Sequence, residues 1–233
     1  GVTLQGALLA STDSLYVPQG RAAPLVYEKS TGKSRGSIPN AGGTYCLLTE
    51  EDQLISGPQN QKEKDQVLRV ADGARRSHLL TFRGTNRMLV NKQFAYLHQG
   101  ENLTALDRVS YVDLQDEKRQ LLAKQAALAK QLKGRKNDQD LKSQHAATGS
   151  RIQMVTASLP KCFKWKIPCG HPIGFAMGGN TLYVGGDGIV MAFNASNGEK
   201  QWSAKVDGKA YGLAISNGRL LVSTDKGHIH CFQ

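Results

Sequence analysis

The stretches NTLYVGGDGIVMAFNASNGEKQW, residues 180–202, and GRLLVSTDKGHIHCF, residues 218–232, repeat one pattern. In both, apolar and polar residues alternate, a turn with Gly and Asp follows, and the alternation resumes. Alternation with a period of two is typical of β-strands with one buried face, and Gly/Asp turns are typical of hairpins. The two stretches therefore predict successive copies of one β-rich unit.

The same unit occurs three more times upstream. These copies begin with ALLASTDSLYV (7–17), YCLLTEEDQLIS (45–56) and RMLVNKQFAYL (87–97). The second strands of the five copies place the following residues in equivalent positions: Tyr16, Leu54, Tyr96, Tyr183 and Leu221. Units of about 40 residues with four short strands are typical of a β-propeller, in which small sheets pack radially about an axis. The sequence therefore predicts an all-β fold, a β-propeller of about five repeats.

The step from Tyr96 to Tyr183 is about twice as long as the others, and the excess has a helical composition. Residues 112–133 lack Gly and Pro and are rich in strong helix formers. Their leucines fall on one face at Leu114, Leu121, Leu128 and Leu132. A second helix is predicted to begin after Asn137 or Asp138 as N-cap and to end before Pro160. We therefore predict an inserted α-helical hairpin.

When the third repeat is aligned with the fourth, Ala105 matches Ala192 and Trp165 matches Trp202. The hairpin therefore replaces the turn before the outermost strand of the third repeat. This alignment divides the chain into three parts. Propeller repeats occupy residues 1–109, the hairpin occupies 110–159, and repeats resume over 160–233. An insertion on a surface turn costs little, since loop-closure entropy grows only logarithmically with length.

The segment AFNASNGEKQW (192–202) and the turns GGDG (185–188) and STDKG (223–227) resemble the PQQ-like repeats of the quinoprotein alcohol dehydrogenase-like family. In that family an Ala, a turn Gly and a Trp of each blade lock neighbouring blades together. The resemblance assigns this structural blade-docking role to Ala105, Trp165, Ala192, Gly198 and Trp202. It also implies a ring of seven or eight blades, so the chain is interpreted as part of a larger ring. The last repeat is similar to large bacterial propeller proteins, some of them fused to a methyltransferase domain.

Quinone chemistry lacks support in the residues. The resemblance would imply quinone, Ca²⁺, an Asp base and often a vicinal disulfide, and no adjacent Cys pair exists. The acids in question are explained as turn residues: Asp13, Asp52, Asp187 and Asp225. We therefore expect no cofactor, neither PQQ nor Ca²⁺, and assign no catalytic residue.

Metal binding has one weak candidate pair. His228 and His230 lie two apart on a predicted strand and so point to one face, which is a chelating geometry. No third ligand accompanies them in the sequence. We expect incidental histidines and no metal site.

The cysteines are Cys46, Cys162, Cys169 and Cys231. They form no CxxC motif, so zinc-ribbon, thioredoxin-like and c-type haem sites have no support. If residues 163–168 are extended, Cys162 and Cys169 lie about 23 Å apart, and a disulfide would need a bend at Pro168. We expect buried free thiols, with the disulfide state left open.

The chain carries 30 Lys and Arg against 19 Asp and Glu, a formal net charge of +11. Clustered cations would favour nucleic acid, but these are scattered. The densest group lies at a predicted helix end, where cations stabilise the helix dipole: Lys130, Lys133, Arg135 and Lys136. We expect no nucleic-acid partner and treat these four residues as candidates for binding a protein.

Two functional hypotheses from different classes remain. The first is a non-catalytic interaction module, from a periplasmic or other extracytoplasmic bacterial protein by family analogy, whose basic hairpin binds a partner. The second is the propeller portion of an enzyme, either a quinoprotein dehydrogenase or a methyltransferase-linked protein. The remaining blades or a second copy of the chain could cover an open sheet edge.

No run of about 18 apolar residues is present, so no membrane span is predicted. The chain begins at Gly1 without an initiator Met or a leader, which we interpret as an excised segment.

Overall fold

A computed structural model describes residues 4–43, 45–64, 66–171 and 173–233. The chain divides into two compact units. The first unit comprises Gly1–Ala105 and Trp165–Gln233, and the second comprises Leu106–Lys164.

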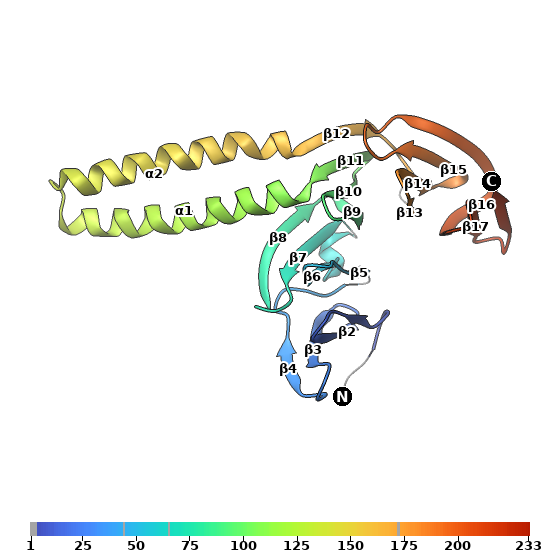
Figure 1. The fold of residues 1–233 in the computed structure, drawn as a ribbon, viewed down its shortest axis with the longest axis horizontal. Helices are drawn as coiled ribbons and strands as arrows, with labels where there is room; N and C mark the ends of the chain where they lie inside the picture. Colours follow the sequence, from blue (N-terminus) through green and yellow to red (C-terminus); the bar gives the residue numbers. More distant parts are fainter. Residues whose placement is uncertain (1–3, 44, 65, 172) are drawn as a thin grey trace. The chain divides into compact units, whose positions relative to one another are not determined.

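The strands of the described residues form four antiparallel sheets (Figure 1). The first sheet holds β1 (Leu9–Ala10), β2 (Ser14–Gln19), β3 (Ala22–Glu28) and β4 (Ser34–Ser37). The second holds β5 (Tyr45–Leu48), β6 (Gln53–Gly57), β7 (Val67–Asp72) and β8 (Ser77–Arg83), with the short helix η1 (Gln61–Glu63) between β6 and β7. The third holds β9 (Thr85–Val90), β10 (Phe94–Gln99), β11 (Asn102–Asp107) and β12 (Phe163–Pro168).

The fourth sheet has six strands in chain order. They are β13 (Gly174–Gly178), β14 (Thr181–Gly185), β15 (Asp187–Asn194), β16 (Lys200–Ser216), β17 (Arg219–Thr224) and β18 (Ile229–Phe232). The first part of β16 pairs with β15, as in Ala192 opposite Trp202, and its last part pairs with β17, as in Ala214 opposite Leu221. Between these parts Gly208 has φ +98°. The sheet is therefore two halves that share one long strand.

Three junctions within this unit are built from buried side chains. The first and second sheets share a cluster of Tyr16, Val26, Ile38, Ala41, Leu54 and Ala71. The third sheet and the first half of the fourth share Tyr96, Leu103, Ala105, Cys169, Leu182, Val184, Met191, Phe193 and Ala195. The two halves of the fourth meet at Val190, Val206, Ala210, Leu220 and Val222. Because a fully buried leucine contributes about 2 kcal/mol, these junctions hold the sheets face to face.

The hydrogen bonds correct one predicted equivalence. The Lys29 N–H donates to the Asp13 carbonyl oxygen, and the Gly73 N–H donates likewise to Asp52, so Asp52 is the counterpart of Asp13. Three residues further on, Tyr16 therefore corresponds to Ile55.

The predicted alignment places Leu54 one position too early, and a shift of one residue moves a side chain to the opposite face of a strand. The reason is turn length. In the turn before β2, the Ser11 N–H donates to the Ser14 carbonyl oxygen. In the turn before β6, the Thr49 N–H donates to the Gln53 carbonyl oxygen, so this turn is one residue longer. The other aligned residues hold their predicted place in a second strand: Tyr16, Tyr96, Tyr183 and Leu221.

The second unit is the predicted hairpin of two antiparallel helices (Figure 1). Helix α1 spans Arg108–Gly134 and begins earlier than predicted, because the Asp107 carboxylate caps it by accepting from the Ser110 N–H at 3.2 Å. Helix α2 spans Gln139–Ser158, and Asp138, one of the two predicted N-caps, accepts from the Leu141 N–H. The short helix η2 (Leu159–Cys162) follows.

The two helices pack against each other through apolar side chains that include the predicted leucine stripe of α1. The buried apolar residues are Leu128, Leu141 and Val155. Leu114, Leu121 and Leu132 of the predicted stripe are half-buried. Across the helices, the Arg151 guanidinium and the Glu117 carboxylate form an ion pair at 2.6 Å. Among the described residues, no helix is long and apolar enough to cross a membrane.

Candidate interaction site

Trp165 on β12 packs on the turn that follows β15 in the next sheet. Its indole Nε1–H donates to the carbonyl oxygen of Ala195 at 3.0 Å. In the same turn, a Cβ at Gly198 would lie 2.8 Å from the Trp165 ring, and Gly198 has φ +75°. The turn thus needs glycine both for its backbone conformation and for the close approach of the indole.

The remaining predicted docking residues lie around this junction and the next one. Ala105 is buried in the cluster between the third and fourth sheets. Ala192 is buried and pairs with Trp202 across strands β15 and β16. Trp202 meets Phe232 edge to face, with ring centroids 5.1 Å apart. Trp202 thus packs on the second half of the fourth sheet, as Trp165 packs on the first half.

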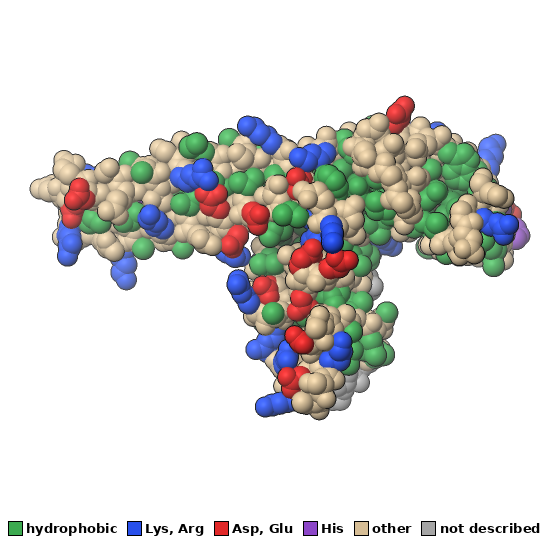
Figure 2. All heavy atoms as spheres, in the orientation of Figure 1, with side chains coloured by type: hydrophobic (Ala, Val, Ile, Leu, Met, Phe, Trp, Pro, Cys, Tyr) green, Lys and Arg blue, Asp and Glu red, His purple; other side chains and the backbone are tan. Residues whose placement is uncertain are grey.

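The two tryptophans differ in what fills the space beside them. A cavity of about 220 Å³ adjoins Trp202 and is lined by Tyr183, Leu220, Phe232 and Gln233, among others. Within the described residues the Trp202 indole N–H has no hydrogen-bond acceptor that corresponds to the Ala195 carbonyl. Figure 2 shows hydrophobic side chains gathered over this sheet. The sequence pattern identified Trp202 but gave no sign of the cavity.

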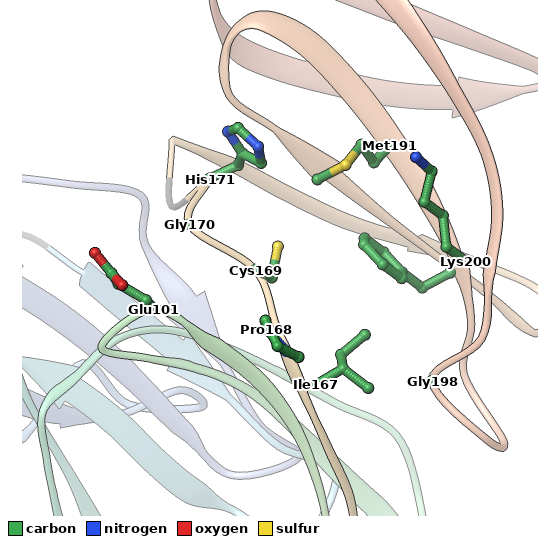
Figure 3. Close-up of a pocket in the computed structure, with 10 residues that line it drawn as sticks. Glu101, Ile167, Pro168, Cys169, Gly170, His171, Met191, Gly198 and Lys200 are labelled. Carbon is green, nitrogen blue, oxygen red and sulfur yellow. The ribbon is translucent and has the colours of Figure 1, made fainter.

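A larger cavity of about 500 Å³ lies between the third sheet and the fourth (Figure 3). It is lined by the Cys169 thiol, the His171 imidazole and the Met191 thioether. Glu101 and Lys200 lie on opposite sides of the cavity. The described residues contain no group of three or more His, Cys, Asp or Glu side chains arranged to hold a metal ion. The lining is mostly apolar, which is suited to packing or to a small uncharged ligand.

His98 connects β10 to this cavity's wall. Its Nε2–H donates to the Cys169 carbonyl oxygen at 2.7 Å, because a carbonyl can only accept. Nδ1 is buried without a partner among the described residues. Burial lowers the pKa of His98, so the ring is neutral near pH 7. Sequence reasoning missed this contact because the two residues are far apart along the chain.

His228 and His230 lie at the end of the fourth sheet, and both are engaged by Asp207. His228 Nδ1 lies 3.2 Å from the Asp207 carboxylate, and the Asp207 backbone N–H donates to His230 Nε2. Lys226 also pairs with Asp207 at 2.6 Å and holds the pKa of that carboxyl below its usual range. A cation beside the imidazoles disfavours a bound metal ion.

The four cationic candidates lie at the turn end of the hairpin and are all exposed: Lys130, Lys133, Arg135 and Lys136. None of them belongs to an ion pair within the described residues. The same end of the hairpin also carries Asp138 and Asp140, and along the rest of the hairpin Lys and Arg side chains are interspersed with Asp and Glu (Figure 2). The arrangement gives a locally basic tip on a mixed surface.

The cysteines are all free among the described residues. Cys162 and Cys169 are buried as predicted, but Cys46 is half-buried and Cys231 is exposed, which corrects the expectation of four buried thiols. Cys231 is exposed because it lies on the outer strand β18, on a face that no further sheet covers among the described residues.

Residues 137–233 match a PQQ-like repeat family model described as outer membrane protein assembly factor BamB. The match confirms the predicted resemblance to PQQ-like repeats in this part of the chain. The suggested link to methyltransferase proteins stays a prediction. No curated protein matches the chain significantly.

Solved structures share the fold at low identity. BamB from Moraxella catarrhalis matches with TM-score 0.57 and 11% identity over 99% of this chain and 59% of its own. The computationally designed Ika8 protein matches with TM-score 0.57 and 10% identity over 97% and 57%. U3-55K matches with TM-score 0.56 and 11% identity over 97% and 59%. The chain therefore has a mostly β, propeller-like fold and spans under two thirds of the length of these structures.

Proposed function

We propose that the chain is a non-catalytic interaction scaffold, a partial PQQ-like propeller whose helical hairpin binds a protein partner. In this proposal each of the first three sheets and each half of the fourth is one blade, which makes about five blades of a larger ring. Further blades or a second copy of the chain complete the assembly. The scaffold works in the periplasm or another extracytoplasmic compartment, by analogy with the outer membrane assembly factor.

The observation that carries the proposal is the exposed, unpaired basic tip of a separate helical unit. Lys130, Lys133, Arg135 and Lys136 keep their charges free, whereas Arg151 is paired with Glu117 inside the hairpin. Four nearby cations favour encounter with an acidic surface and raise its association rate at low salt. The partner we infer is therefore an acidic protein.

A charge-reversal experiment tests the hairpin. All four tip cations are changed to Glu, and the control carries four Lys→Glu changes at exposed positions away from the tip: Lys33, Lys92, Lys124 and Lys205. Both variants have the same net charge. Proteins cross-linked in an extract of the source cells are quantified by mass spectrometry. We expect a partner held by the parent and the control and lost from the tip variant; equal retention by both variants would contradict the proposal.

A second experiment separates binding from folding. Deleting Tyr111 to Leu159 should leave the β-sheet circular dichroism intact, because the two strands that the hairpin joins, β11 and β12, pair directly. The deletion should abolish partner binding. Complete unfolding would show that the hairpin is part of the core.

The enzyme hypothesis has its own test. Adding PQQ and Ca²⁺ at equal concentration to the chain should cause no spectral change and no dye-linked alcohol oxidation. Oxidation at stoichiometric cofactor would contradict a non-catalytic scaffold.

A further inference from the structure

Two sulfur atoms and an imidazole border the cavity of about 500 Å³ between the third sheet and the fourth. In Figure 3 the Cys169 thiol and the Met191 thioether point toward the same space, and the His171 imidazole lies beside it. Cys169 and Met191 are buried, whereas His171 is half-buried. Buried sulfur side chains ordinarily fill a close-packed core, but these two adjoin open volume and are therefore available to a ligand.

The backbone of Cys169 is held on two sides. Its N–H donates to the Glu101 carbonyl oxygen at 2.8 Å, and its own carbonyl oxygen accepts from His98 Nε2–H at 2.7 Å. His98 belongs to β10 and is buried, so the loop after β12 is anchored to the third sheet. The backbone that carries the thiol is therefore in place before any ligand binds.

The other two donors come from different segments. Met191 lies within β15, where it pairs with Val184 on one side and Ser203 on the other. The His171 ring packs on the backbone of Gly186, since a Cβ added there would lie 2.5 Å from His171 Nδ1. Nε2, on the opposite side of the ring, is therefore the nitrogen that can bind a ligand.

The charges around the cavity favour a monovalent ion. Glu101 and Lys200 are exposed, opposite in sign and on opposite sides of the cavity, so together they add no net charge. Among the three donors, only Cys169 can become an anion. A monovalent cation on its thiolate forms a neutral pair, which a mostly apolar lining accommodates, whereas a divalent ion would keep a positive charge.

The donor types favour a soft ion. Thiolate and thioether sulfur select Cu⁺ over harder ions, and imidazole also binds copper. Across the described ranges, no three His, Cys, Asp or Glu side chains are arranged to hold a metal ion, so the usual ligand set of Zn²⁺ is missing there. Met191 supplies a third donor, and a thioether binds only soft ions well.

We propose that Cys169, His171 and Met191 form a three-coordinate binding site for Cu⁺. The ion replaces the thiol proton: the sulfur–hydrogen bond breaks, a sulfur–copper bond forms, and the proton passes to solvent. Copper stays in the +1 state, so no oxidant or reductant takes part. The site lies within the first unit and does not use the hairpin, so it stands apart from the function proposed above.

Titration with Cu⁺ in the absence of oxygen tests the site. Cys231 is exposed and would bind Cu⁺ by itself, so the parent for every measurement carries Cys231→Ser. The ion is delivered from a chromogenic chelator of known affinity. We expect one Cu⁺ per chain, retained in about a tenfold excess of Zn²⁺ because the thioether adds nothing to zinc binding.

Proton release provides a second readout on the same parent. Burial raises the pKa of the Cys169 thiol, while the His171 backbone N–H, which donates to the sulfur, lowers it. The thiol is thus protonated near pH 7, and calorimetry in buffers of different ionisation enthalpy should count one proton released per ion. X-ray absorption at the copper edge should show two sulfur donors and one nitrogen donor.

Three pairs of variants identify the donors. Outer-shell partners alone typically contribute about 10- to 100-fold to metal affinity. Cys169→Ser should therefore weaken Cu⁺ binding at least about 100-fold, and Met191→Leu and His171→Gln at least about tenfold each. The controls remove the same kinds of side chain from outside the cavity lining and should bind like the parent: Cys162→Ser, Met177→Leu and His145→Gln.

Several results would overturn the proposal. These are the absence of binding tighter than about 1 μM, displacement of Cu⁺ by Zn²⁺, a copper shell without two sulfur donors, and an unchanged affinity in any of the three cavity variants. The proton count and the absorption spectrum are measured on the parent, so a variant that failed to fold would not obscure the answer.

Discussion

Trp165 and Trp202 hold the same place in two neighbouring repeats, yet their surroundings differ. Trp165 donates to the Ala195 carbonyl and packs against Gly198, so its junction is complete. Trp202 has Phe232 on one side and a cavity of about 220 Å³ on the other. A repeated side chain therefore stabilises the fold only as far as the next repeat supplies its contact surface. Mutations at the two positions should separate the intrinsic effect of a tryptophan from the effect of docking.

The largest contrast should come from removing each indole. Trp165→Ala loses packing, a hydrogen bond and the contact between two sheets, so we expect a loss of about 2–3 kcal/mol in unfolding free energy. Trp202→Ala loses one aromatic contact beside an existing cavity and should cost about 1 kcal/mol. Urea denaturation followed by far-ultraviolet circular dichroism measures both. Equal losses would show that the Ala195 turn adds nothing to the Trp165 junction.

Two glycines in matching turns sharpen the same comparison. The Gly198 N–H donates to the Asn194 carbonyl oxygen, and the Gly32 N–H donates to the Glu28 carbonyl oxygen, both at 2.8 Å. The φ angles are +75° at Gly198 and +72° at Gly32. The space around them differs. An added Cβ at Gly198 would meet the Trp165 ring at 2.8 Å, whereas one at Gly32 would meet nothing within 4 Å.

Alanine at each glycine should therefore separate backbone strain from docking. Gly32→Ala should cost about 1 kcal/mol, because only the left-handed backbone is strained. Gly198→Ala should cost about 2 kcal/mol, since the indole must also move. Thermal and urea denaturation of the two variants measure the difference. If Gly32→Ala were as damaging as Gly198→Ala, backbone strain alone would explain both, and the docking contact would be unimportant.

The strands and the hairpin could be predicted because their signals are local. Period-two alternation and Gly/Asp turns identified the repeats, and the run of strong helix formers in residues 112–133 identified α1. The sequence predicts the start of α1 too late because Asp107 acts as the N-cap, a role visible only when the end of β11 is known. The offset at Leu54 arose because turn length changes register without changing the apolar pattern.

The candidate site was only partly predictable, because its parts are distant in sequence. The Ala, Gly and Trp pattern pointed to Trp165 and Gly198, but the bond between His98 and Cys169 joins residues 71 positions apart. No local pattern reports such a contact. The exposure of Cys231 likewise depends on whether another sheet covers its face of β18, and a strand pattern alone does not report this.

A smaller contrast separates Tyr16 of the first repeat from Leu221 of the last repeat, which hold equivalent positions on their second strands. Tyr16 is fully buried, and its hydroxyl donates to the Asp52 carboxylate of the next sheet at 2.6 Å. Leu221 occupies the same place in the last repeat and is 38% exposed. Burial first, and then the bond to Asp52, raise the pKa of Tyr16 above its ordinary value of 10.0.

The raised pKa makes this junction sensitive to alkaline pH. The protonated hydroxyl stabilises the fold fully below pH 10, and the contribution is lost as pH rises toward the folded-state pKa, because the unfolded chain ionises first. At pH 10.5 we expect a loss of somewhat under 1 kcal/mol from Tyr16. Tyr16→Phe should flatten this decline, measured as urea midpoints between pH 8 and 10.5. Burial raises the pKa of Tyr45 to about 12. Ionisation of Tyr45 therefore leaves some decline of stability with pH in both the parent and Tyr16→Phe. An unchanged pH profile in Tyr16→Phe would show that the hydroxyl ionises equally in the folded and unfolded chain.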